Sequence, residues 1–451
     1  MERALHAEHA LLPGGWAENV RLVFDDAGGI ASVMKGVTVR PGDARAAIAV
    51  PGICNLHCHA FQRAMAGLAE CASPDGQDSF WSWREIMYGF ARRIDPVALN
   101  AIAAMAYMEM LQSGFTGVGE FHYLHHGPGG APYDDHAEMA VQIIDAARHT
   151  GIGLTLLPVY YARAGFDGGA LQTRQQRFGH SLQGFADLIA ALQARYPSLT
   201  LGIAPHSLRA VSTDDMLALA QMFPDMPVHI HAAEQVREVE ECRAALGVPP
   251  VRWLLDHAGV DGRWCLVHAT HMDAGESRDL ARSGAVAGLC PVTEANLGDG
   301  LFPAVEYLQA GGRFGIGSDS CVRIDLAGEL RLLDYGQRLR TGARTPLAPP
   351  GSSSGATLYT KALCGGAQAL RQNAGALAIG KRADIVTLDA HHPALAARMD
   401  DAWLDGWIYG AVTSTVQEVY CAGRRVVTHG RHKDAESIEA AFRQTLARLL
   451  A

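Results

Sequence analysis

Between residues 51 and about 375, segments with helical periodicity alternate strictly with short apolar runs bounded by glycine or proline. We expect helices at 96–112, 136–148, 182–196, 213–222, 251–258, 273–282 and 303–310. The expected strands are 48–54, 116–121, 151–159, 200–204, 228–230, 264–268, 286–290 and 314–316. Strict alternation favours a parallel sheet with crossover helices, and eight units favour a closed (β/α)8 TIM-like barrel. An open doubly wound sheet is the alternative interpretation of this α/β pattern.

The two ends of the chain differ from this middle part. Residues 1–50 and 376–430 contain β-branched runs separated by tight glycine and proline turns, and a last helix is expected at 435–450. Because chain termini often lie close together, we predict one small β-sandwich domain built from both ends. The predicted organisation is therefore 1–50 for the N-terminal part of the β domain, 51–375 for the barrel, and 376–451 for the C-terminal part with the closing helix.

Composition excludes several classes of function. Hydrophobic residues make up 49% of the 451 residues and charged residues 19%, which is typical of a globular protein with a large core. The net charge of −9 and the lack of a long basic run argue against a nucleic-acid partner. The N-terminus has no continuous apolar h-region and no apolar run approaches 18 residues, so we expect no membrane partner and a cytoplasmic location. Nine scattered cysteines without a CxxC pair argue against a disulfide framework.

A histidine pair ends the first expected barrel strand. His57 and His59 stand two residues apart in the stretch PGICNLHCH at 51–59. Residues i and i+2 of a strand point to the same side, so both imidazoles can converge on one point, as two ligands of a divalent metal do. An HxH pair alone is weak evidence, because a chance pair on a wet surface has the same spacing.

Polar residues also follow the fourth to the eighth expected strands. They are His206 and Arg209, then His229, His231 and Glu234, then His268, Thr270 and His271, then Thr293, Glu294, Asn296 and Asp299, and last Ser318, Asp319 and Ser320. Functional residues of a (β/α)8 barrel lie at the C-terminal ends of its strands. Structural histidines that cap strands would explain one or two of these positions, but poorly explain five strands in succession.

These segments resemble the amidohydrolase superfamily over nearly the whole chain. The matching pieces are PGICNLHCH at 51–59, HIHAAE at 229–234, the strand-end His268, GSDS at 317–320 and the closing segment at 375–389. The resemblance implies that His57, His59, His231 and Asp319 bind the metal. It also implies that Glu234, His268 and Asp319 act as catalytic residues on the substrate and its protons.

The resemblance further implies the number and chemistry of the metal. Binuclear members of the superfamily use a carboxylated lysine on the fourth strand, but no lysine lies between residues 36 and 360, which argues for one metal ion. Zn²⁺ is the first choice for three nitrogens and one carboxylate, and Fe²⁺ also suits these ligands. Bound zinc lowers the pKa of its water to about 7 and supplies hydroxide. Asp319 would accept the proton of that water, Glu234 would carry it to the leaving ammonia, and His268 would polarise the attacked carbon.

Within the deaminase branch, the chain is most similar to the family of N-formimino-L-glutamate (formimidoylglutamate) deiminases of histidine degradation. The segments that carry this resemblance are HCHAFQRAMAGLAE at 57–70, SFWSWRE at 79–85, GEFHYLHH at 119–126, HSLRAV at 206–211 and CPVTEANLGDGLFP at 290–303. The implied reaction converts N-formimino-L-glutamate and water into N-formyl-L-glutamate and ammonia. The resemblance also implies a homodimer.

Such a small, dianionic, amino-acid-derived substrate needs cations and donors in its pocket. Arg209 near a strand end can bind a carboxylate with two parallel hydrogen bonds. Further candidates for substrate binding, expected on neighbouring loops, are Gln62, Arg84, Tyr123 and His206. The alternative for Arg84 is an ion pair with Glu85 or another acid, and the alternative for Tyr123 is core packing. We expect His122, His125 and His126 to be loop residues and His271 to be structural.

Two other functions stay open from the sequence. The first is another deaminase or chlorohydrolase of the same superfamily, acting on a purine, pterin or triazine. Such an enzyme would act on a neutral ring and would not depend on Arg209. The second is a scaffold protein that has lost catalysis, and the presence of all four metal ligands together with Glu234 and His268 argues against it.

Overall fold

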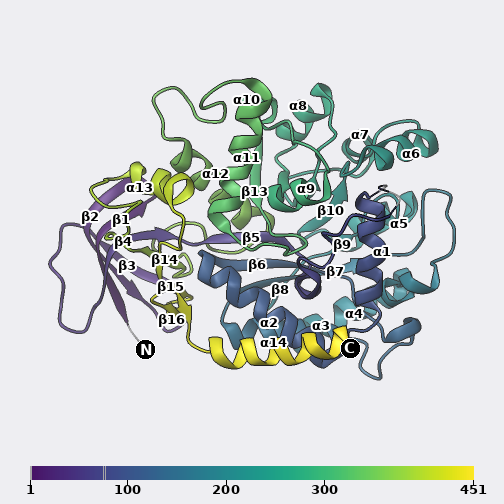
Figure 1. Cartoon of the computed structure of the whole chain (residues 1–451), viewed down its shortest axis with the longest axis horizontal. Helices are drawn as coiled ribbons and strands as arrows, with labels where there is room; N and C mark the ends of the chain where they lie inside the picture. Colours follow the sequence, from purple (N-terminus) through teal and green to yellow (C-terminus); the bar gives the residue numbers. More distant parts are fainter. Residues whose placement is uncertain (1–2, 75, 77) are drawn as a thin grey trace.

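The computed structural model describes residues 3–74, 76 and 78–451. A small sheet lies at one end of the molecule, and a larger body of parallel strands surrounded by helices makes up the rest (Figure 1). The strands of the larger body are β5 (Ile53–Cys58), β6 (Phe115–His122), β7 (Gly153–Tyr160), β8 (Thr200–Leu201), β9 (Ala204–Pro205), β10 (Val228–Ala232), β11 (Trp264–His268), β12 (Val286–Leu289) and β13 (Arg313–Ile316). The expected strand 48–54 is in fact divided at Gly52, because residues 48–51 end strand β4 (Ala44–Pro51) of the small sheet and residues 53–54 begin β5. The other expected strands are present, and the strands of the larger body pair in parallel.

These strands form two sheets, β5-β6-β7-β8 and β10-β11-β12-β13, with β9 paired to β7. Isolated parallel bridges join the sheets at both edges, from Ile203 to Val228 and from Cys58 to Asp319. At the second edge the His59 amide donates to the Asp319 carbonyl at 2.9 Å. The first strand and the last strand therefore end side by side.

The fourth expected strand, 200–204, is in fact split into β8 and β9. Gly202 lies at the break, where a Cβ atom would meet the Leu157 side chain at 2.6 Å and the Pro227 carbonyl oxygen at 2.8 Å. Only glycine fits this close approach of the neighbouring segments, which contact the backbone where the chain passes from one sheet toward the other.

The seven expected helices are confirmed with shifts of a few residues at their ends. They are α2 (Pro96–Ser113), α3 (Glu138–Thr150), α4 (Leu182–Arg195), α5 (Thr213–Met222), α7 (Pro250–His257), α8 (Ala274–Ser283) and α10 (Ala304–Gln309). In α2 the Asp95 side chain accepts a hydrogen bond from the Ala98 amide at the start, and Gly114 ends the helix with a positive φ of 103°. In the described part of the larger body, five further α-helices were not predicted: α1 (Phe80–Ala91), α6 (Val236–Leu246), α9 (Pro291–Leu297), α11 (Leu326–Thr341) and α12 (Ser354–Ala369).

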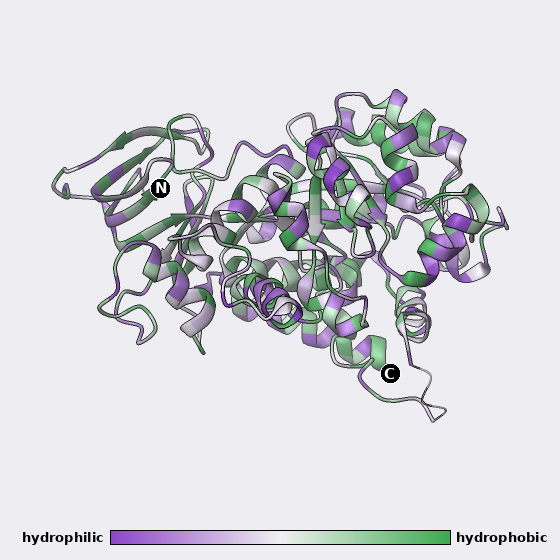
Figure 2. Ribbon diagram, turned by 90° about the horizontal axis from the view of Figure 1, so that it is seen from above, coloured by the Kyte–Doolittle hydropathy of each residue, from purple (hydrophilic) through white to green (hydrophobic). Residues whose placement is uncertain are grey.

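The small sheet contains strands from both ends of the chain. Its order is β17-β16-β15-β14-β4-β1-β2-β3. The bounds are β1 (Ala4–Leu12), β2 (Gly15–Phe24), β3 (Ile30–Met34), β4 (Ala44–Pro51), β14 (Ile385–Leu388), β15 (Val416–Cys421), β16 (Arg424–Thr428) and β17 (Arg431–His432). The two ends meet where β4 pairs with β14 in antiparallel register. Seen from above, this sheet stands at the end that carries the N-terminus (Figure 2). Its further folding into a two-layered sandwich stays a prediction.

Two expectations for the C-terminal part need correction. Residues 376–430 are not strands throughout, because they contain α13 (Asp401–Asp405) and the π-helical turn η4 (Gly406–Gly410). The closing helix α14 (Ala435–Leu450) lies along α2 on the larger body rather than on the small sheet (Figure 1). There the Arg93 guanidinium donates to the Leu449 carbonyl at 2.8 Å. In the described part of the chain, no helix is long and apolar enough to cross a membrane.

Candidate metal centre and active site

Four predicted metal ligands meet where the first and last strands end. The Nε2 atom of His57 lies 3.2 Å from Nε2 of His59 and 3.2 Å from Nε2 of His231. Asp319 Oδ1 lies 3.4 Å from Nε2 of His57 and 3.3 Å from Nε2 of His59. All four side chains are buried. Three imidazoles and one carboxylate thus face a common point.

Backbone carbonyls orient two of these imidazoles. His59 donates its Nδ1–H to the Phe121 carbonyl at 3.0 Å, and His231 donates its Nδ1–H to the His206 carbonyl at 3.2 Å. With Nδ1 protonated, each Nε2 keeps its lone pair and points at the common centre, as metal-binding histidines do.

The charge state of the cluster fits a bound divalent cation. Burial lowers the pKa of His57 to about 3 and also lowers the pKa values of His59 and His231. Burial opposes ionisation of Asp319, yet its contacts with the neighbouring histidines hold its pKa below the usual range. Neutral imidazoles and an ionised carboxylate are the metal-binding forms. Ligands 2.0–2.1 Å from a tetrahedral zinc ion lie roughly 3.3 Å apart, which matches the observed spacing of 3.2–3.4 Å.

The strand ends that form the site carry unusual backbone conformations. Five non-glycine residues next to the ligands have φ between 42° and 67°: Ala233, His268, Ala269, Asp319 and Cys321. Each side chain in this left-handed region costs free energy, and such positions concentrate at functional sites. The strain follows the ends of β10, β11 and β13, where the predicted catalytic residues lie.

Glu234 and His268 lie beside the metal cluster. His268 Nε2 is 3.6 Å from Glu234 Oε1 and 3.7 Å from Asp319 Oδ2, and its Nδ1 is 3.3 Å from Glu294 Oε1. Burial raises the pKa of Glu234 to about 7. Burial opposes the imidazolium form of His268, but the three carboxylates around it raise its pKa well above the usual value. The pair can therefore hold and transfer a proton near neutral pH.

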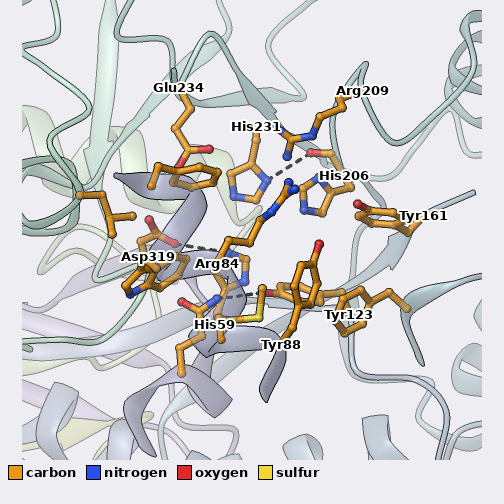
Figure 3. Close-up of a pocket in the computed structure, with 16 residues that line it drawn as sticks. His59, Arg84, Tyr88, Tyr123, Tyr161, His206, Arg209, His231, Glu234 and Asp319 are labelled. Carbon is orange, nitrogen blue, oxygen red and sulfur yellow. Dashed lines mark hydrogen bonds and ion pairs between the residues drawn. The ribbon is translucent and has the colours of Figure 1, made fainter. Parts of the chain in front are cut away.

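A cleft opens beside the cluster. Its lining includes these predicted site residues: His59, Gln62, Arg84, Tyr123, His206, Arg209, His231, Glu234 and Asp319. In Figure 3, Glu234 and Asp319 lie on one side of the cleft and Tyr161 on the other, while Arg84 and Arg209 point toward the centre. His57 and His268 have no exposed surface and lie behind this lining.

The placement of Arg84 corrects two expectations. Arg84 lies on helix α1, not on a loop. It does not pair with Glu85, which forms its ion pair with Arg174 instead. Arg84 and Arg209 have no ion pair with any carboxylate of the described residues, and the Nε atom of each is buried without a hydrogen-bond partner there. Burial lowers the pKa of Arg84, and the neighbouring charge of Arg209 lowers it further.

The other predicted substrate-binding residues also meet in the cleft. Gln62, on the short helix η1 (Ala60–Met65), donates its amide to the Tyr123 hydroxyl at 2.7 Å. Its amide oxygen is buried and has no partner among the described residues. Burial lowers the pKa of His206 well below its usual value, so this imidazole is neutral. The cleft thus offers neutral donors and acceptors around two cationic groups.

Two buried acids near the site were not predicted as functional. Glu120 on β6 accepts hydrogen bonds from the Ala60 amide at 3.0 Å and from the Tyr107 hydroxyl at 3.0 Å, and so holds the chain next to His59. Glu294 binds His268 Nδ1 and the Cys290 amide. Glu294 follows a strand in the sequence, which was a usable signal, whereas the role of Glu120 depends on contacts between distant segments.

Four histidines, of which His122 and His125 are buried and His126 and His180 half-buried, form a second cluster outside the metal site. Their ring centroids lie 5.1 Å apart for His122 and His125, 4.4 Å for His125 and His180, and 4.9 Å for His126 and His180. Burial lowers the pKa of His122 and of His180 to about 3, and also lowers the pKa values of the other two. His125 and His126 lie on a loop as expected, but His122 ends strand β6.

We expect this cluster to make folding stability depend on pH. A neutral imidazole with a lowered folded-state pKa binds a proton mainly after unfolding, so its contribution is complete above about pH 6.5 and is lost as the pH falls below that value. At pH 5 each fully shifted histidine costs about 2 kcal/mol. Between pH 7 and pH 5, the free energy of unfolding measured in urea should therefore fall less for His180→Gln than for the parent protein. The exposed control His391→Gln should follow the parent, and an equal loss in all three proteins would contradict the prediction.

Comparisons with known proteins agree with this geometry. The family profile described as "Amidohydrolase family" matches residues 48–426, and "Formimidoylglutamate deiminase HutF, N-terminal domain" matches residues 2–47. The formimidoylglutamate deiminase of Pseudomonas aeruginosa is 48% identical over 451 residues, covering 99% of each chain. The 8-oxoguanine deaminase of the same organism is 28% identical over 352 residues, covering 76% of this chain and 74% of that relative.

Two solved structures place the fold. The amidohydrolase from Brucella melitensis superposes with a TM-score of 0.95 at 49% identity and covers all of both chains. The zinc-complexed atrazine chlorohydrolase from Arthrobacter aurescens superposes with a TM-score of 0.85 at 23% identity, covering 98% of this chain and 99% of that one. The family and these neighbours imply a TIM-barrel fold with an additional N-terminal domain. The chain therefore belongs to the amidohydrolase family and, within it, to the formimidoylglutamate deiminases.

Proposed function

We propose that this chain catalyses the hydrolytic deimination of N-formimino-L-glutamate, a reaction of histidine degradation. Water adds to the formimino carbon, the bond from that carbon to its terminal nitrogen breaks, and N-formyl-L-glutamate and ammonia are released. The 48% identical relative named for this activity supports the assignment. The dianionic, amino-acid-derived substrate is part of the proposal.

One observation in the structure carries the substrate assignment. Arg84 and Arg209 both line the cleft beside the metal cluster, and neither has a carboxylate partner in the described part of the chain. The desolvated Arg84 guanidinium lies close enough to Arg209 to be repelled by its charge, which is costly unless an anion joins them. The charges of Glu238 and Glu234, by contrast, act on Arg209 from longer range. A substrate with two carboxylates supplies both partners, whereas a neutral purine or triazine ring supplies none.

The proposed substrate-binding residues have different roles according to their positions in the cleft. Arg84 and Arg209 bind the two carboxylates, and Gln62, Tyr123 and His206 complete the walls that orient the substrate. This leaves the formimino group facing Glu234, on the side of the cleft where Asp319 lies (Figure 3).

Three catalytic groups then transfer the protons. Asp319 accepts the proton of the attacking water, and Glu234, whose pKa burial raises to about 7, delivers a proton to the departing nitrogen. His268 holds a proton close to Glu234 and Asp319, where it stabilises negative charge in the transition state.

His57, His59, His231 and Asp319 would hold the divalent cation, and their donor set favours Zn²⁺ while remaining compatible with Fe²⁺. A cation bound there lowers the pKa of water to about 7 and so supplies hydroxide at neutral pH. The zinc seen in the chlorohydrolase structure belongs to that protein and supports only the choice of metal to test first.

We also propose that the parallel strands close into one barrel and that the small sheet folds into a sandwich. The bridges from Ile203 to Val228 and from Cys58 to Asp319 support closure of the parallel strands into one barrel. A separate hydrophobic core inside the small sheet, with Leu5, Leu22 and Ile385 among its members, supports its folding into a sandwich. The homodimer and the cytoplasmic location stay predictions.

The test is ammonia release by the purified, metal-analysed protein from N-formimino-L-glutamate, with guanine and cytosine as comparison substrates. Turnover of the formimino compound with about one metal ion per chain is the expected result. Turnover of a ring substrate instead would favour the alternative, a ring deaminase such as the 8-oxoguanine deaminase relative, and would overturn the assignment of Arg84 and Arg209.

Arg209→Ala should lower kcat/KM for the formimino substrate by about 10²-fold, because loss of one partner of a buried charge pair costs about 2–5 kcal/mol. Arg209→Lys should fall between parent and alanine variant, since it keeps the charge but loses the planar fork. Steady-state kinetics check both values, with the ion-paired surface variant Arg195→Ala as a control. Unchanged kinetics of Arg209→Ala would remove this residue from the carboxylate site.

A further inference from the structure

Helix α1 carries two aromatic rings that are in contact with Arg84 of the same helix and with arginines from two other segments. The Arg84 guanidinium lies 4.5 Å from the ring centroid of Trp81 and 5.6 Å from that of Tyr88. Arg237 of α6 lies 4.5 Å from the Trp81 centroid, and Arg174 of the short helix η3 (Thr173–Phe178) lies 4.9 Å from the Tyr88 centroid. We call this series, Arg237–Trp81–Arg84–Tyr88–Arg174, the aromatic–arginine row.

The charges of the row are distributed unequally. The outer arginines have acidic partners, since Arg237 pairs with Glu241 and Arg174 pairs with Glu85. The inner Arg84 has no such partner among residues 3–74, 76 and 78–451. Only the arginine that faces the cleft is therefore left with its charge uncompensated.

Aromatic faces suit an arginine that has to bind an anion. A carboxylate partner would occupy the N–H donors in the plane of the guanidinium and would compete with the substrate. A ring instead attracts the cation through its face and leaves the donors at the edge of the fork free. Two rings along one helix also restrict the rotation of the long side chain, which lowers the entropy lost on binding.

Core packing alone explains an aromatic side chain at Tyr88 but not at Trp81. Helix α1 buries Phe80, Met87, Tyr88 and Ala91 against the body of the protein. Trp81 is only half-buried and does not belong to the hydrophobic core, yet three guanidinium groups lie within 5.6 Å of its centroid, those of Arg84, Arg209 and Arg237. Besides the Phe80 ring, whose centroid lies 5.1 Å away, its surroundings are cationic.

We propose that Trp81 is a positioning residue that holds the Arg84 guanidinium, edge-on and unpaired, for one carboxylate of a dianionic substrate. Trp81 acts through Arg84 and need not touch the reacting atoms. This inference rests on the function proposed above, and it adds a residue on which recognition of the carboxylate depends.

The test is a double-mutant cycle of Trp81 and Arg84. Trp81→Leu should raise KM for N-formimino-L-glutamate about tenfold with kcat changed less than about threefold, from the size of a desolvated cation–π contact. Trp81→Phe should recover most of the loss, because phenylalanine keeps a ring face. In the Arg84→Ala background, Trp81→Leu should add less than about twofold. Trp16→Leu, a half-buried tryptophan on the small sheet, is the control for loss of an indole.

A second measurement separates this inference from the proposed function. Glutarate is a dianion with the five-carbon dicarboxylate chain of the glutamate part of the substrate. It is titrated calorimetrically into the same variants, so that binding is measured without turnover. An equal effect of Trp81→Leu with and without Arg84, or a Trp81→Phe variant as weak as Trp81→Leu, would overturn the positioning role. Absence of turnover in the parent would overturn the proposed function, while coupled glutarate affinities would still support the role of Trp81.

Discussion

Replacement of Glu234 by glutamine should lower kcat by about 10²- to 10⁴-fold, the range that a positioned general acid–base group contributes. The amide has the same size as the carboxylate but can neither accept nor deliver the proton. Glu234 lines the cleft, lies 3.6 Å from His268 Nε2, and has a pKa that burial raises to about 7. Since the proposed partners of the substrate carboxylates are Arg84 and Arg209, KM should change much less than kcat.

Kinetics, metal analysis and thermal unfolding of the same preparation check this prediction. Metal content should stay at about one ion per chain, because Glu234 is not one of the four ligands. The matched control is Glu238→Gln, one helical turn along, where the buried carboxylate accepts a hydrogen bond from the Glu234 amide at 2.9 Å. That control should keep kcat within about tenfold of the parent, since glutamine can still accept this bond. An unchanged kcat in Glu234→Gln would show that another group transfers the proton.

The cluster of four candidate metal ligands could be predicted because the fold brings strand ends that are distant in the sequence to one edge of the sheet. His57 and His59 point the same way from one strand, and parallel strands bring His231 and Asp319 to the same edge. The bridge between Cys58 and Asp319 places the ends of the first and last strands side by side. Once these two strands are neighbours, the strand-end positions of the four side chains imply that they meet. The role of each residue, by contrast, came from resemblance to a family.

Other parts of the site depend on contacts that no local pattern encodes. Trp81, Arg84 and Tyr88 share one face of α1 because they are three and four residues apart, but the position of Arg84 in the cleft depends on how α1 packs against the larger body. Glu120 orders the chain after His59 by accepting a bond from the Ala60 amide, which is 60 residues away in sequence. Strand β1 was missed because ALHAEHALL lacks the β-branched residues that mark strands.

Replacement of His231 by alanine should reduce bound metal from about one ion per chain to a small fraction of that value, and kcat should fall by about 10³-fold or more. Loss of a residue that only orients a ligand already costs about 10- to 100-fold in affinity or activity, so loss of the ligand itself should cost more. His231 Nε2 lies 3.2 Å from His57 Nε2 and is one of three nitrogens facing the centre. Metal analysis after dialysis and steady-state kinetics give both numbers.

Strand β10 supplies its own control, because His229 is a second buried imidazole on the same strand and the same face, two residues before His231. His229 donates its Nε2–H to the Ala369 carbonyl at 2.9 Å and is not part of the metal cluster. His229→Ala should therefore lower the unfolding free energy by about 1–3 kcal/mol, by leaving that carbonyl unpaired, while the metal stays bound. Loss of metal from both variants would mean that burial of the strand controls metal binding. Loss from His231→Ala alone would assign the metal to the layer of side chains at the strand ends, where the proposed catalytic residues also lie.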